Sequence, residues 1–134
     1  MHTDQDKLLT KDSQQAFFTK DGKFLVSVGT QDLTLIDVQK EQIVSTLRFE
    51  QISISGLSTA HKYVVLVDKK AKDLYLMMVL KLPTFECVLQ TELKFLRKEA
   101  FPMIKFDQDD SIAFRATQKN TIEVICMTTY SVLN

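Results

Sequence analysis

Clustered carboxylates are the first feature of this sequence that could carry chemistry. Asp107, Asp109 and Asp110 form its densest acidic group, and hard cations such as Ca²⁺ prefer several carboxylate oxygens as ligands. The group lacks the glycine and the distal glutamate of an EF-hand loop, and it falls between two strand-like segments. We therefore interpret it as an acidic turn and predict no metal site.

Histidine and cysteine, which commonly bind metals or act in catalysis, are sparse. His61 lies in a polar turn with no Cys, Asp or Glu at metal-ligand spacing, which indicates a solvated loop residue. Cys87 and Cys126 are far apart in the sequence, and each lies inside an apolar, strand-like run. This placement favours buried free thiols over a disulfide or a metal site.

The sequence also lacks the motifs of nucleotide binding and covalent catalysis. It contains no Gly-rich phosphate loop, nucleophile elbow, Ser/His/Asp set or CxxC, and its scarcity of glycine disfavours nucleotide cradles. An RNA stacking platform needs aromatic and basic residues on one exposed face, and only Phe114-Arg115 offers such a pair. Two basic groups are interpreted as solubilising charge: Lys69, Lys70 and Lys72, and Lys94, Arg97 and Lys98. We predict that the chain is not an enzyme, needs no cofactor and has no catalytic residue, and we assign no binding residue.

The length and composition are those of a single soluble domain. The 134 residues can bury one sizeable core, and 45% hydrophobic and 25% charged residues are ordinary values for a globular protein. The 17 basic and 17 acidic residues cancel, so the chain lacks the overall charge of a stand-alone nucleic-acid-binding protein. The first residues carry acids and no apolar signal region, and no run of about 18 apolar residues follows, so we expect a cytoplasmic protein.

The segments that would position any site alternate between apolar and polar residues, as β-strands do. In the clearest stretch, residues 16–29, Phe17-Phe18 and Phe24–Val28 flank Lys20-Asp21-Gly22. Asp-Gly can adopt the positive φ angles that tight turns require, so this stretch predicts a β-hairpin. Nine later segments also predict strands: residues 33–38, 43–49, 52–57, 63–67, 74–80, 85–89, 103–106, 112–116 and 121–126. Two further segments are assigned more loosely, with a possible helical turn at 93–100 and a possible last strand at 127–134.

The predicted hairpins repeat in the same phase. Phe18 before the first turn matches Leu57 and Phe106, at successive spacings of 39 and 49 residues. Periods of about 40 to 45 residues are typical of propeller blades with four strands each. We therefore predict an all-β protein of antiparallel four-stranded meanders, as WD40-like β-propeller blades. It would have about two and a half blades, at residues 14–49, 50–93 and 99–134, after a polar N-terminal arm at 1–13.

An open array of blades leaves apolar faces uncovered, because a blade buries both faces only against its neighbours. Closed propellers typically have four to eight blades. Three arrangements therefore remain open. The chain is part of a longer propeller, it pairs with other chains, or its strands form a small sandwich.

The order of several segments resembles a known family. The resemblance is carried by five of them: residues 18–24, 33–38, 73–76, 101–116 and 120–124. The last two are the most specific, since they combine a proline-led strand, an acidic turn, a strand and an Asn-x-x-Glu-Val pattern. In this order the chain resembles the N-terminal propeller of eukaryotic translation initiation factor 2A. Family members usually carry tryptophan where this chain has Ser27 and Ile104, and the propeller of initiation factor 3 subunit b, with the same turn pattern, is a competing match.

The resemblance implies a non-enzymatic factor that acts with the small ribosomal subunit and initiator tRNA. The matching motifs are structural turns and strands, so no tRNA-contacting residue can be assigned. Without the family match, the same repeats predict a WD40-type interaction module of another complex, which binds other proteins through its propeller faces and no membrane.

Overall fold

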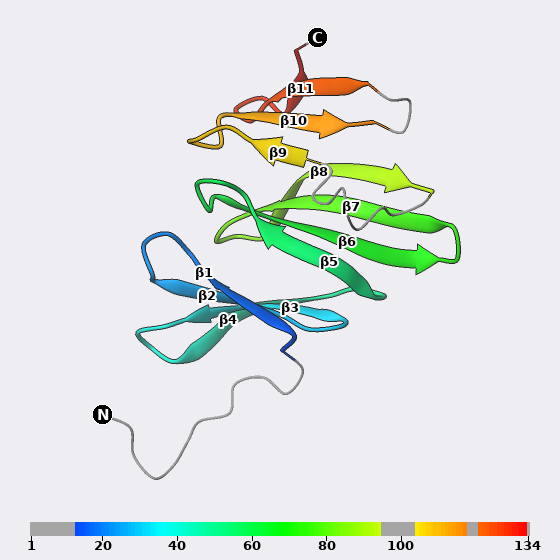
Figure 1. The fold of residues 1–134 in the computed structure, drawn as a ribbon. Helices are drawn as coiled ribbons and strands as arrows, with labels where there is room; N and C mark the ends of the chain where they lie inside the picture. Colours follow the sequence, from blue (N-terminus) through cyan, green and yellow to red (C-terminus); the bar gives the residue numbers. More distant parts are fainter. Residues whose placement is uncertain (1–12, 95–103, 118–120, 134) are drawn as a thin grey trace. The chain divides into compact units, whose positions relative to one another are not determined.

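The computed structural model describes residues 13–94, 104–117 and 121–133. Within these ranges the chain forms twelve β-strands and no helix, arranged as three four-stranded sheets (Figure 1). Neighbouring strands pair antiparallel in sequence order, so the predicted all-β class and four-stranded meanders are confirmed. The predicted arm lies outside the described residues apart from residue 13. So does most of the predicted helical turn, whose first residue, Leu93, ends a strand instead.

The first sheet belongs to the first of two compact units, residues 1–49 and 50–134. Its strands, in the order β1-β2-β3-β4, are β1 (Gln15–Phe18), β2 (Phe24–Val28), β3 (Asp32–Asp37) and β4 (Gln42–Arg48). Side chains alternate between the two faces of a strand, so Val26 lies opposite Leu35 and Val28 opposite Leu33 on one face. All four are buried, which gives this sheet its apolar centre.

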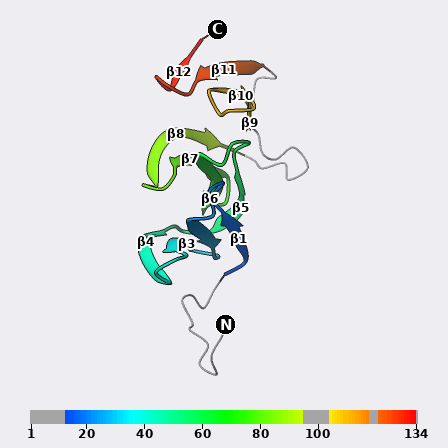
Figure 2. The same cartoon turned by 90° about the vertical axis from the view of Figure 1, so that its left-hand side faces the viewer.

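The second unit contains two sheets of the same kind. One is formed by β5 (Ile52–Leu57), β6 (Tyr63–Ala71), β7 (Leu74–Lys81) and β8 (Glu86–Leu93). The other is formed by β9 (Ile104–Phe106), β10 (Ile112–Ala116), β11 (Ile122–Cys126) and β12 (Ser131–Val132). The last of these confirms the final strand expected within residues 127–134. The two sheets lie side by side in both ribbon views (Figures 1 and 2).

The first hairpin of each sheet has the same five-residue turn. The first turn residue donates its backbone N–H to the carbonyl of the residue that opens the next strand, at 2.9, 2.9 and 3.0 Å. The fourth turn residue has a positive φ, of 72°, 61° and 61°. These first and fourth residues are Thr19 and Gly22, Ser58 and His61, and Asp107 and Asp110. The turns are 39 and 49 residues apart, so the repeat phase predicted from the sequence is confirmed.

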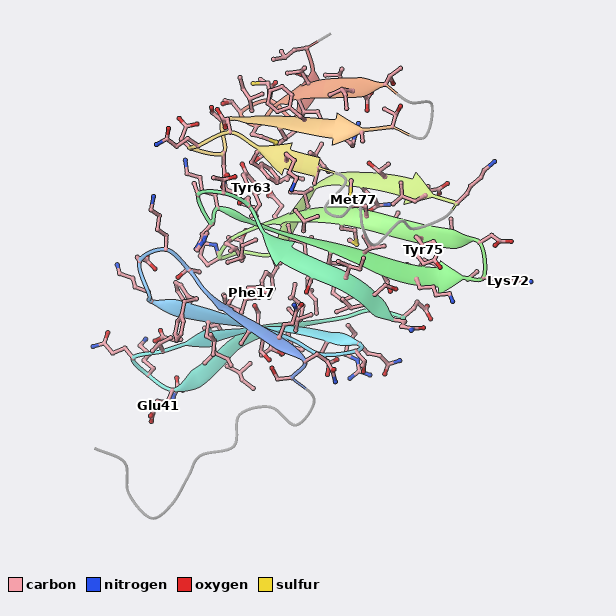
Figure 3. The ribbon with its side chains drawn as sticks, viewed as in Figure 1. Phe17, Glu41, Tyr63, Lys72, Tyr75 and Met77 are labelled. Atoms are coloured by element: carbon pink, nitrogen blue, oxygen red, sulfur yellow. The ribbon has the colours of Figure 1, made fainter. Side chains whose placement is uncertain are left out.

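The two sheets of the second unit share one hydrophobic core. Its buried members are Tyr63, Val65, Val67, Met77, Val79, Leu93, Ile104, Ala113, Ile125 and Met127. The Tyr63 ring stacks on Phe106 with a centroid distance of 5.8 Å and an interplanar angle of 11°. Burial, reinforced by the Tyr130 hydroxyl 3.5 Å away, raises the pKa of Tyr63. Figure 3 labels Tyr63 and Met77, which mark this core on β6 and β7.

Candidate functional site

The acidic run forms the turn between β9 and β10, as predicted, but its three carboxylates have different partners. Asp107 Oδ1 accepts hydrogen bonds from the backbone N–H groups of Ser111 at 2.8 Å and Ile112 at 3.0 Å. The N–H of Ile112 and the Ser111 side chain lower the pKa of Asp107. Asp109 accepts the Ser111 hydroxyl at 2.7 Å. Asp107 and Asp109 are therefore occupied within their own turn.

Asp110 points away from its own turn and joins the two sheets of the second unit. It is only 2% exposed. Its Oδ2 accepts hydrogen bonds from Ser58 Oγ at 2.6 Å and from the backbone N–H of Lys62 at 3.1 Å. Its Oδ1 accepts the backbone N–H of Ala60 at 3.0 Å. We call this set of three hydrogen bonds to the β5–β6 turn the Asp110 latch.

The β5–β6 turn uses an external carboxylate because it has none of its own. In the first sheet, Asp21 Oδ1 accepts the hydroxyl of Thr19 at 2.8 Å and the N–H of Lys23 at 2.9 Å. The N–H of Lys23 and the Thr19 hydroxyl lower the pKa of Asp21. The residue at the position of Asp21 is Asp109 in the third turn but Ala60 in the middle one. The latch therefore supplies from the next sheet the carboxylate that the middle turn lacks.

His61 is in a turn, as predicted, but it is not fully solvated. Its φ is 61°, its side chain is half-buried, and Nδ1 is buried without a hydrogen-bond partner. Across the part of the chain that the structure describes, no group of three or more His, Cys, Asp or Glu residues could hold a metal ion. The carboxylates of the acidic run are instead hydrogen-bonded within their own turn and to the β5–β6 turn.

The two cysteines are free, but the prediction that both are buried is wrong. Cys87 is exposed and Cys126 is half-buried. β8 is the edge strand of its sheet, so Cys87 has a neighbouring strand on one side only. The protein around its sulfur still raises the pKa of Cys87 by desolvation. Hydrogen bonds from Thr129 and then Thr128 lower the pKa of Cys126 to about 7.

These opposite shifts predict different thiol reactivities. At pH 7 about half of Cys126 is thiolate, and the thiolate is the nucleophile, so iodoacetamide should alkylate Cys126 at least about tenfold faster than Cys87. Peptide mass spectrometry over a pH series would follow both sites, and the Cys126 rate should show a midpoint near pH 7. Thr129→Val should move that midpoint upward. Equal rates for both thiols at pH 7 would contradict the prediction.

Phe114 and Arg115 do not form a stacking platform, because consecutive strand residues point to opposite faces of the sheet. Phe114 is 43% exposed. The Arg115 guanidinium is largely buried and bonds Glu123 Oε1 through Nε at 3.0 Å and Nη2 at 2.7 Å, and Thr91 Oγ1 through Nη1 at 2.8 Å. Arg115 lines a groove of about 360 Å³ beside β8, and Glu92 and Glu123 line it too, so its charge does not favour an anion.

The first basic group lies around the β6–β7 hairpin and partly supports the fold. Lys70 Nζ lies 2.9 Å from Oδ2 of the fully buried Asp68, whose Oδ1 also accepts the N–H of Gln51 at 2.8 Å. Lys69 Nζ lies 6.0 Å from the ring centroid of Tyr75. Figure 3 shows Tyr75 and Lys72 at this end of the sheet. In the second group, Arg97 and Lys98 lie outside the described residues.

The chain is similar in fold to several known proteins, although not in sequence. No protein-family model and no curated protein matches the sequence. Solved structures do match. A crystal structure described as that of the eukaryotic initiation factor aligns with a TM-score of 0.71 at 15% identity, over 91% of this chain and 31% of that chain. The WD40 repeats of RRP9 align with a TM-score of 0.59 at 10% identity, over 97% of this chain and 39% of that one.

The chain has the fold of WD40 propeller blades. It spans less than half the length of the initiation factor and RRP9 chains. The hydrazine synthase of Kuenenia stuttgartiensis also aligns, with a TM-score of 0.58 at 13% identity, over 100% of this chain and 38% of that one. Blades of this kind thus occur in chains named for different activities, and the fold by itself does not assign one. No helix among the described residues is long and apolar enough to cross a membrane.

Proposed function

We propose that this chain is a non-enzymatic binding scaffold of translation initiation, similar to the propeller of eukaryotic translation initiation factor 2A. In this proposal its WD40-like blades associate with the small ribosomal subunit and initiator tRNA in the cytoplasm. The observation that carries it is the order of matching segments, above all residues 101–116 and 120–124. The fold similarity to an initiation factor, with a TM-score of 0.71, supports it independently of that order.

The side chains that could carry chemistry are engaged in contacts within the blades, which is consistent with a scaffold. Asp110 is occupied by the latch, and Asp107 and Asp109 by their own turn. Arg115 is occupied by Glu123 and Thr91. In this proposal these groups stabilise the blades, and function rests on binding surfaces.

The second candidate is a WD40-type interaction module of a complex outside translation. It is favoured by the similarity to the WD40 repeats of RRP9, which covers 97% of this chain. A tagged chain should then recover one defined assembly that contains no ribosomal proteins. Recovery of small-subunit proteins would favour the first proposal instead.

Co-sedimentation tests the proposed function. The purified chain, mixed with purified small ribosomal subunits and initiator tRNA, should enter the subunit peak of a sucrose gradient, and large subunits should not carry it. Circular dichroism of the same preparation establishes that the β structure is intact. A folded chain that stays at the top of the gradient at micromolar subunit concentration would remove the translational proposal.

A further inference from the structure

We draw no further inference here: the strongest candidate, the exposed apolar face of the third sheet around Phe114 and Ile122, carries none because nothing in the structure shows what covers it.

Discussion

Asp110→Ala is expected to lower the free energy of unfolding of the second unit by about 3 to 5 kcal/mol. Asp110→Asn should lower it by less. The carboxylate is 2% exposed and accepts three hydrogen bonds. Its removal leaves the backbone N–H groups of Ala60 and Lys62 without their acceptor, and leaves the buried Ser58 hydroxyl with only the Tyr63 carbonyl, at 3.2 Å. Each such group costs about 1 to 3 kcal/mol when it is left unsatisfied. Asparagine keeps one acceptor oxygen and tolerates the positive φ, so it separates the loss of charge from backbone strain.

Tyrosine fluorescence during urea unfolding of the full chain measures this effect. The chain has three tyrosines and no tryptophan, and Tyr63, Tyr75 and Tyr130 all lie in the second unit. Asp109→Ala is the matched control, because its contacts to Ser111 stay within one exposed turn, and it should cost no more than about 1 kcal/mol. Equal losses for Asp110 and Asp109 would show that the latch contributes nothing beyond its own turn.

The strands and their phase could be predicted because both depend on local sequence. Alternation of apolar and polar residues located the strands, and the Asp21-Gly22 turn anchored the first hairpin. The equivalent turns at 58–62 and 107–111 have no glycine at the positive φ, yet they keep the hydrogen-bond pattern. The regular spacing of the strands therefore identifies the repeat even where the turn residues differ.

The latch could not be predicted, because it joins residues about 50 positions apart in the chain. Three acids in one run look alike in sequence, and only the backbone conformation directs Asp110 away from its own turn. A signal was nevertheless present in the aligned turns. Asp110 occupies the position of Gly22, and Ala60 replaces the acid found at Asp21 and Asp109. The extra acid at Asp110 in the third turn, together with the missing acid at Ala60 in the preceding turn, is the pattern that indicates the contact between these two sheets.

Cys87 and Arg115 show a second limit of local patterns. An apolar, strand-like run predicts burial, but Cys87 lies on an edge strand and is exposed. Arg115 follows Phe114 in a strand, which in the sequence suggests a pair that could contact RNA. In the structure its guanidinium instead bonds Glu123 and Thr91 and has a structural role. Both outcomes depend on the neighbouring strand or sheet, which no single segment encodes.

Truncation of Ile125 to alanine is expected to destabilise the second unit by about 2 to 5 kcal/mol, comparable to the loss of the latch. Ile125 is fully buried in the core that β6 and β7 share with β10 and β11, so the truncation leaves a cavity between two sheets. Ile125→Val, which removes a single methylene, should cost about 0.5 to 1.5 kcal/mol. The same tyrosine-monitored urea titration measures both.

Leu133→Ala is the control for the Ile125 series, because Leu133 lies near the same end of the sheet but is 60% exposed. It should change stability by no more than about 0.5 kcal/mol. Combining Ile125→Ala with Asp110→Asn tests whether core and latch hold the same junction. Because both act between the same two sheets, their effects should be non-additive by about 0.5 kcal/mol or more. Strict additivity would show that the turn contact and the apolar core stabilise the blade pair independently.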